Sequence, residues 1–192
     1  EEGILDDIVL TNEQGLIDSG ANTFLLDGHN PVAALSAVER IRKTPRTSIA
    51  PVFYTHAQGA RFFVLADRMV QSCEELLPTA QGLLASTSEL NIPAILQSGD
   101  FRLLAWLYTR RSEELLPVAD PFSPSIYSYP IAECFAENGT NVVYWLHNLQ
   151  AQGQLIPGRL IDRIRLCPKC GGSHLNFVDV CPSCRSIAIS QT

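Results

Sequence analysis

The chain has 192 residues, of which 46% are hydrophobic and 18% are charged. This balance is ordinary for a folded globular protein and argues against an intrinsically disordered chain. Its apolar runs fall far short of the roughly 20 residues that span a bilayer, so we expect no membrane partner. Cys73 and Cys134 show no pairing pattern, which favours a reducing compartment, and we therefore expect a cytoplasmic protein. The chain opens with Glu1 rather than Met, as expected of a piece of a longer protein.

The net charge of −6 hides an uneven distribution along the chain. Residues 1–140 hold 9 Lys and Arg against 18 Asp and Glu, whereas residues 141–192 hold 5 against 2. Proteins gain general affinity for nucleic acids by neutralising phosphates with Lys and Arg. The acidic body is therefore unsuited to that partner, and only the basic tail has the right charge for it.

Residues 1–91 alternate segments with the patterns of strands and helices. Three short apolar segments predict strands, namely 22–27, 49–55 and 62–70. The segment 73–86 predicts a helix that Pro78 interrupts. Strands that alternate with helices predict a parallel sheet with right-handed crossovers, so we expect an α/β domain here.

The first of these helices has clear start and stop signals. Asn30 is suited to cap it, Pro31 fits its first turn, and Pro45 ends it. Apolar residues recur at three-residue steps and predict its inner face: Val32, Leu35, Val38 and Ile41.

The segment FLLDGHNP, with the helix and the PVFYTH strand that follow it, resembles the middle of a response-regulator receiver domain. In receivers a strand ends in a phosphoacceptor Asp, and Pro follows four residues later. Asp27 and Pro31 match that spacing, and Thr55 or His56 falls near the receiver's switch hydroxyl. The resemblance makes Asp27 the candidate phosphoacceptor.

The same region departs from a working receiver in two ways. Asp6 and Asp7 precede the strand-like IVL segment, whereas a receiver holds magnesium with acidic residues at the carboxyl end of its first strand. Nor does Lys-Pro follow the last strand. Without these groups the charge of a phosphoryl transition state is not neutralised. We therefore expect a degenerate receiver that serves as a dimerisation or docking surface.

Residues 92–166 predict helices followed by a strand. The helix within 98–117 is expected to bury most of its apolar side chains, with Phe101, Leu104, Ala105 and Tyr108 on the main stripe and Leu103, Trp106 and Leu107 beside it. Four prolines between residues 117 and 130 then predict a surface linker.

A winged-helix-like α+β arrangement is predicted after that linker. A short helix within 129–140 precedes a second helix, which Asn141 caps and Gly153 ends. Its expected inner face comprises Val142, Trp145, Leu146 and Leu149. The segment 159–166 then predicts a strand.

Winged helices commonly bind DNA with their second helix. That helix carries no Lys or Arg in this chain. Three arginines beyond it share one face of the predicted strand by its period of two: Arg159, Arg163 and Arg165. They are candidate contacts for phosphate or for a protein partner, and we rank nucleic acid second.

The segment CPKCGGSHLNFVDVCPSC contains two Cys-x-x-Cys pairs, formed by Cys167, Cys170, Cys181 and Cys184. Each pair folds its second sulfur back beside the first, so that four thiolates surround one tetrahedral ion. We predict one structural Zn²⁺ per chain in a zinc ribbon at residues 167–192. Four sulfur ligands leave no position open for catalysis. A redox dithiol or a disulfide pair remains the alternative.

The region from WLHNLQAQG to VCPSC is similar to the thaumarchaeal output domain family of signal-output modules. The similarity rests on the four cysteines and on Gly171, His174, Leu175 and Val180. It implies a place beside other signalling domains. We therefore expect a non-enzymatic output or adaptor protein that binds a protein partner, with a homodimer as a further candidate. The alternative is a winged-helix transcription regulator that uses Arg159, Arg163 and Arg165.

Overall fold

The computed structural model describes residues 8–9, 21–56, 59–111, 114–123, 126–165, 167–170, 172–173 and 182–184. The chain forms two compact units. Unit 1 comprises residues 1–118 and 129–158, and unit 2 comprises residues 119–128 and 159–192. Among the described helices, none combines the length and the apolar character that a membrane span requires.

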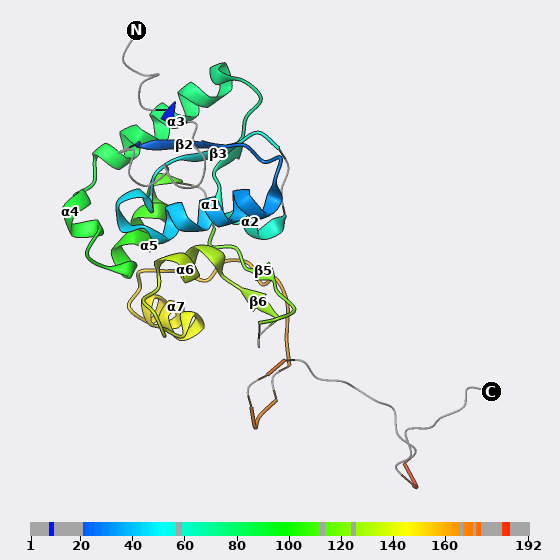
Figure 1. Cartoon of the computed structure of the whole chain (residues 1–192). Coiled ribbons are helices and arrows are strands. Elements are labelled where there is room, and N and C mark those ends of the chain that lie inside the picture. The colour runs from blue at the N-terminus through cyan, green and yellow to red at the C-terminus, as the bar shows by residue number, and fades with distance from the viewer. Residues whose placement is uncertain are drawn as a thin grey trace. The chain divides into compact units, whose positions relative to one another are not determined.

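Unit 1 is built around a four-stranded parallel sheet (Figure 1). The strands lie side by side in chain order: β1 (Ile8–Val9), β2 (Thr23–Leu26), β3 (Val52–Tyr54) and β4 (Arg68–Met69). Phe24 pairs with Val52, and Tyr54 pairs with Met69. The predicted strands within 22–27 and 49–55 are confirmed, as is their parallel pairing.

The strand predicted for 62–70 is wrong over most of its length. Ala60–Leu65 forms helix α2, and only Arg68–Met69 pairs with the sheet. Phe62 and Leu65 are both buried. A separation of three residues places two side chains on the same face of a helix but on opposite faces of a strand. The core contact of both residues therefore favours the helix.

Helix α1 (Pro31–Lys43) begins and ends as predicted. The Asn30 side chain accepts hydrogen bonds from the backbone N–H groups of Val32 and Ala33, each at 3.1 Å. Beyond the helix, Pro45–Thr47 forms the 3₁₀ turn η2. The Asn30 cap and the following Pro45 were therefore reliable sequence signals for the two ends of this helix.

The predicted inner face of α1 is correct only in its second half. Val38 and Ile41 are fully buried, but the Val32 side chain is 77% exposed. At 3.6 residues per turn, nine residues amount to a rotation of about 180°, so Val32 and Ile41 lie on opposite sides of the helix. The buried stripe begins instead with Ala34 and Ala37.

Side chains of β2 and β3 alternate between two cores on opposite faces of the sheet. Phe24 and Val52 belong to the larger core, together with residues of α1 and α2. Phe53 belongs to the smaller core, together with Leu76 and Ala80 of α3 (Cys73–Ser88). Helix α3 covers one face of the sheet, whereas α1 and α2 cover the other (Figure 1).

Helix α3 runs through Pro78 without the predicted interruption. The Ser72 side chain accepts a hydrogen bond from the Glu75 N–H, and the Glu75 carboxylate accepts one from the Gln71 N–H. The Ser72 contact caps the helix, and the Glu75 contact holds the preceding residue against the first turn. Burial of apolar side chains after Pro78 offsets the backbone hydrogen bond that the proline lacks.

Helix α5 (Gly99–Thr109) follows the short helix α4 (Ile92–Ile95) and buries only part of the face predicted for it. Leu103 and Trp106 are buried, whereas Phe101 and Tyr108 are each 51% exposed. This helix carries apolar side chains on all of its sides, so the sequence pattern did not show which side is buried. The packing of Leu103 and Trp106 in the larger core determines which side of the helix faces inward.

Helices α5, α6 (Pro130–Phe135) and α7 (Val142–Ala151) share the larger core with the sheet. Helix α6 packs against α1, α2 and α5. The sequence boundary that we predicted at residue 91 therefore does not separate compact units. Helix α7 has the predicted Asn141 cap, at 3.1 Å from the Tyr144 N–H, and Gly153 follows it with φ of 73°.

The proline-rich segment predicted as a linker contains a short two-stranded sheet of β5 (Val118–Ala119) and β6 (Tyr127–Ser128). The Asp120 N–H donates to the Ile126 carbonyl at 2.7 Å. The Asp120 side chain also accepts from the Phe122 N–H at 2.9 Å and starts the turn. Prolines thus exclude a helix here but do not exclude short strands.

Candidate functional site

A buried carboxylate, Asp67, joins two arginines from distant parts of unit 1. It accepts hydrogen bonds from Arg42 Nη2 at 3.1 Å and from Arg110 Nε and Nη2 at 2.7 and 3.0 Å. The Asp67 side chain is 6% exposed, and those of Arg42 and Arg110 are 0% and 4% exposed. Burial alone would raise the pKa of Asp67, but the charges of Arg110 and Arg42 lower it below its usual value of 3.8.

Backbone carbonyl groups complete this cluster. Arg42 Nε donates to the Leu65 carbonyl at 2.7 Å, and Arg110 Nη1 donates to the Ile49 carbonyl at 3.0 Å. Burial lowers the pKa of Arg42 to about 10, which still leaves it charged at neutral pH. The sequence analysis missed this cluster, although Arg42 lies four residues after the buried Val38 and thus on the inner stripe of α1.

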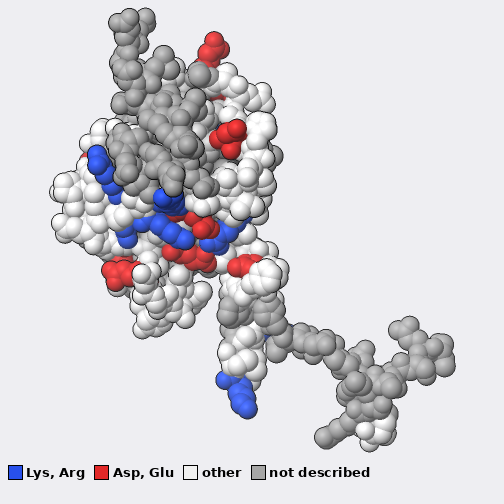
Figure 2. All heavy atoms as spheres, in the orientation of Figure 1, with Lys and Arg blue, Asp and Glu red and all other residues white. Residues whose placement is uncertain are grey.

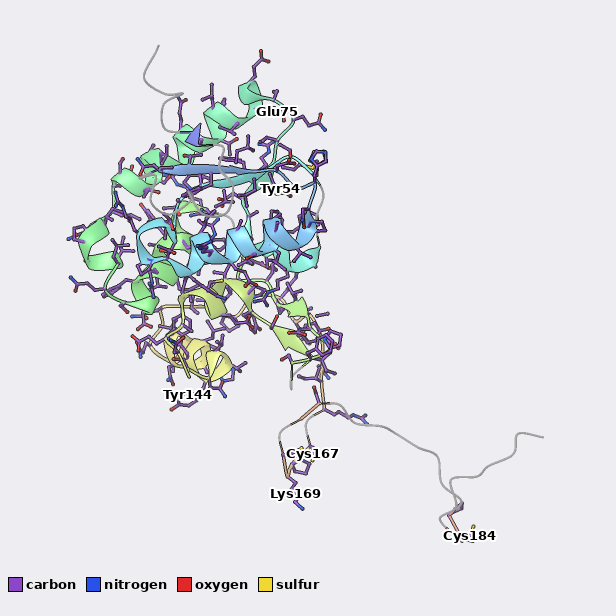
Figure 3. All side chains as sticks on the ribbon, viewed as in Figure 1. Tyr54, Glu75, Tyr144, Cys167, Lys169 and Cys184 are labelled. Atoms are coloured by element: carbon purple, nitrogen blue, oxygen red, sulfur yellow. The ribbon has the colours of Figure 1, made fainter. Side chains whose placement is uncertain are left out.

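The first predicted zinc knuckle lies in a turn at residues 168–170. The Cys167 N–H donates to the Gly172 carbonyl at 2.8 Å and closes the knuckle. Cys170 is exposed, and Figure 3 shows Cys167 and Lys169 on the same loop. In the second knuckle, Pro182–Cys184 also forms a turn, and Cys184 is exposed. Cys181 and His174 lie outside the described residues.

The donor set of the first knuckle fits a zinc ion. Hydrogen bonds from the Cys170 and Lys169 backbones, with one from the Cys170 thiol, lower the pKa of the Cys167 thiol. A lowered pKa favours the thiolate, which is the form that binds zinc. By contrast, burial raises the pKa of the Cys134 thiol to about 11. Cys134 is therefore a buried core residue whose thiol is held in its neutral form.

The three candidate arginines lie in an exposed, extended segment of unit 2. All seven residues from 159 to 165 are exposed, and the structure assigns no β-strand to them. The expectation that a strand would turn Arg159, Arg163 and Arg165 to one face therefore fails for these residues. Tyr127 Oη donates to Asp162 Oδ2 at 2.8 Å and ties the segment to β6 within unit 2.

Helix α7, the predicted recognition helix, has few groups that suit DNA. Leu146 and Leu149 are buried, and Trp145 Nε1 donates to Asp100 Oδ1 at 2.6 Å. Tyr144 is 68% exposed and points away from the helix (Figure 3). The outward face therefore offers an aromatic ring and neutral polar groups, but no Lys or Arg.

Asp27 lies where β2 ends, at the carboxyl edge of the sheet. Its Oδ1 lies 2.5 Å from His29 Nδ1 and 3.6 Å from His56 Nδ1. The hydrogen bonds from the His29 side chain and backbone lower the pKa of Asp27. Thr55 Oγ1 lies 2.8 Å from His56 Nδ1. The structure thus brings together Asp27 with the two residues considered for the switch position, and it adds His29, which the sequence analysis did not single out.

A small pocket lies beside the buried ion cluster in unit 1. Its volume is about 190 Å³, and its lining includes Asp67, Trp106, Glu114 and Ile131. Sites for small-molecule ligands typically measure roughly 300–1,000 Å³. We assign this pocket no ligand.

Residues 93–192 match the family model described as thaumarchaeal output domain 1. The match covers more than half of the chain. The chain belongs to this family. Neither the curated proteins nor the solved structures include a match.

The output domain begins within α4 and includes the described parts of unit 2. Its helices α5, α6 and α7 lie in unit 1 and share a core with the sheet that precedes the domain. Membership of this family gives the chain a role in signal output. The buried cluster connects the two regions of sequence directly, because Arg110 belongs to the output domain, whereas Arg42 and Asp67 precede it.

Proposed function

We propose that this chain is a non-enzymatic output or adaptor protein whose zinc-stabilised unit 2 binds a protein partner. One observation carries the proposal. Unit 2 exposes large apolar side chains, of which Phe122 is 95% exposed and Leu160 is 71% exposed. Leu160, Ile161 and Ile164 are all exposed within one short segment, and contiguous exposed apolar groups are typical of protein-binding surfaces. A ribbon held by one Zn²⁺ at Cys167, Cys170, Cys181 and Cys184 would keep this region folded.

The strand order of the sheet before the output domain supports the degenerate receiver in this proposal. Receiver-type sheets have the strand order 2-1-3-4-5, so their strands 1, 3, 4 and 5 lie in sequence. The four parallel strands of unit 1 follow such a continuous order, and Asp27 follows the second. Val70 and Gln71 follow the last strand in place of a Lys. We expect no phosphoryl adduct on Asp27 after incubation with a small phosphodonor and Mg²⁺, as measured by intact mass.

Capture of partners by the full, zinc-loaded chain tests the role of unit 2. Leu160→Glu places a charge on the exposed apolar segment and should abolish capture. Val32→Glu is the matched control, because Val32 is 77% exposed on α1 of unit 1. Proteins that bind the original chain and Val32→Glu, but not Leu160→Glu, would support the proposal. Equal capture by all three chains would contradict it.

DNA binding through the basic tail is the second candidate function. Arg159, Arg163 and Arg165 are exposed, so they are accessible to phosphates. In unit 1, however, Lys and Arg side chains lie among Asp and Glu on the face that Figure 2 displays, rather than in one basic patch. DNA affinity that falls steeply with salt, with a slope reduced by about 1 in Arg163→Ala, would favour this candidate over a protein partner.

A further inference from the structure

Two loops of unit 1 bring metal-binding side chains to the same edge of the parallel sheet. Asp27 and His29 follow β2, and His56 follows β3. Leu26 and Tyr54 pair across these strands, and the Thr55 N–H donates to the Leu26 carbonyl at 3.2 Å. Residues that are far apart in sequence therefore become neighbours because parallel strands end at a common edge.

The three side chains converge on a single oxygen. Oδ1 of Asp27 lies 2.5 Å from Nδ1 of His29 and 3.6 Å from Nδ1 of His56. The two imidazole rings lie 3.9 Å apart between their centroids. One ligand atom from each of the three residues lies within 4.8 Å of the other two. Among the described residues, this is the group that brings three such ligands together.

We propose that Asp27, His29 and His56 bind one divalent first-row transition-metal ion such as Zn²⁺. Two ligands that each lie about 2.1 Å from a tetrahedral ion are about 3.4 Å apart, and the Asp27–His56 distance already matches this value. The shorter Asp27–His29 distance is that of a hydrogen bond, and an ion takes the place of its proton.

The chemistry of the three ligands determines the class of ion. Imidazole suits Zn²⁺, Cu²⁺, Fe²⁺ and Ni²⁺, whereas Mg²⁺ and Ca²⁺ prefer sites made of oxygen ligands. The side chains of Asp27, His29 and His56 are 71%, 72% and 48% exposed. Three protein ligands at an exposed edge leave coordination positions open for water or for a further ligand. This ion is distinct from the structural zinc proposed for the ribbon.

The location of the site suggests what metal binding does. The two loops lead to α1 and α2, and both helices pack against α6 of the output domain. An ion that bridges the loops binds the folded form of unit 1 and raises its melting temperature. It also occupies the carboxylate that a working receiver would phosphorylate.

Titration of the full chain with Co²⁺ tests this site. The ribbon is first loaded with zinc, and excess ion is removed by gel filtration. We expect one Co²⁺ per chain, with absorption bands of nitrogen and oxygen coordination, no thiolate-to-cobalt charge-transfer band, and a higher melting temperature. The single variants Asp27→Asn, His29→Gln and His56→Gln should each weaken Co²⁺ binding by at least about tenfold.

His147→Gln is the matched control, because His147 is an exposed histidine on α7. It should bind Co²⁺ as the original chain does. Circular dichroism of each variant before titration shows whether it is folded. Unchanged Co²⁺ affinity in the three site variants would overturn the proposal. So would a thiolate charge-transfer band as the only signal, since Co²⁺ would then occupy only the cysteines.

Discussion

In unit 1, large side chains such as Phe24, Phe53 and Phe135 are completely buried, and two cores enclose the sheet. The described residues of unit 2 contribute none of the buried hydrophobic side chains, and Phe122 and Leu160 are exposed there. Unit 1 is thus stabilised by apolar burial. Unit 2 is close in size to the roughly 40 residues below which domains usually need metals, disulfides or a partner.

The two units also differ in how they place their charged and polar groups. In unit 1, Asp67 neutralises buried arginines inside the core. In unit 2, Cys170 and Cys184 lie in exposed turns, where the proposed ion would take the place of a core. The proposed function therefore assigns apolar burial to unit 1 and a metal ion to unit 2 as their main sources of stability.

Removal of zinc should have the largest effect and should be confined to unit 2. A structural zinc site contributes about 10–16 kcal/mol of binding free energy, and unit 2 has no described apolar core to replace it. In a chain that carries zinc only at the ribbon cysteines, chelation should therefore abolish hydrogen-exchange protection in unit 2 and leave protection in unit 1 unchanged. Cys134→Ala, in the core of unit 1, should still bind one zinc. Full protection of unit 2 after chelation would show that the metal is not needed.

Asp67→Ala should have the next largest effect and should be confined to unit 1. It leaves the guanidinium groups of Arg42 and Arg110 buried without their carboxylate. Removal of one partner of a buried ion pair costs about 3–5 kcal/mol. Urea unfolding measures the loss, and zinc content should stay the same. Asp162→Ala, at an exposed carboxylate of unit 2, is the control that should leave the stability of unit 1 unchanged.

A pair of glycine substitutions tests how closely the output domain helices pack in unit 1. A Cβ atom at Gly99 of α5 would lie 2.5 Å from the Phe135 carbonyl oxygen of α6. Gly99→Ala should therefore destabilise unit 1 by about 1–3 kcal/mol. Gly82→Ala in α3 meets nothing within 4 Å and should stabilise it by about 0.5–1 kcal/mol. Urea midpoints that move in the same direction would contradict this packing.

A change of pH should have the smallest effect of these tests. The stability of unit 1 should be nearly constant around neutral pH and should fall only in acid. The folded state lowers the pKa of Asp67, so the unfolded chain binds the proton more readily. The stability that Asp67 contributes is present above its ordinary pKa of 3.8 and is lost as the pH falls toward its folded pKa. The urea midpoint of unit 1 should decline below about pH 4 in the original chain. Asp67→Ala should lack this part of the decline.

Local signals in the sequence were sufficient for several elements. Asn30 and Asn141 cap helices as predicted, and the apolar segments around Phe24 and Val52 form paired strands. These features depend on backbone geometry and on side chains close to them in sequence. The output domain resemblance belongs to the same class, because a motif requires no knowledge of distant contacts. The family match confirms that resemblance.

Tertiary structure decided which face of each helix is buried and which distant residues meet. Val32 and Phe101 are apolar yet exposed, while Arg42 is charged yet fully buried. Hydrophobicity alone would predict the opposite, with Val32 and Phe101 buried and Arg42 exposed. Only the tertiary structure shows that Arg42 contacts Asp67 and that His29 and His56 converge on Asp27. The physical reason is that burial and coordination depend on neighbours in space, which parallel strands bring together from separate parts of the sequence.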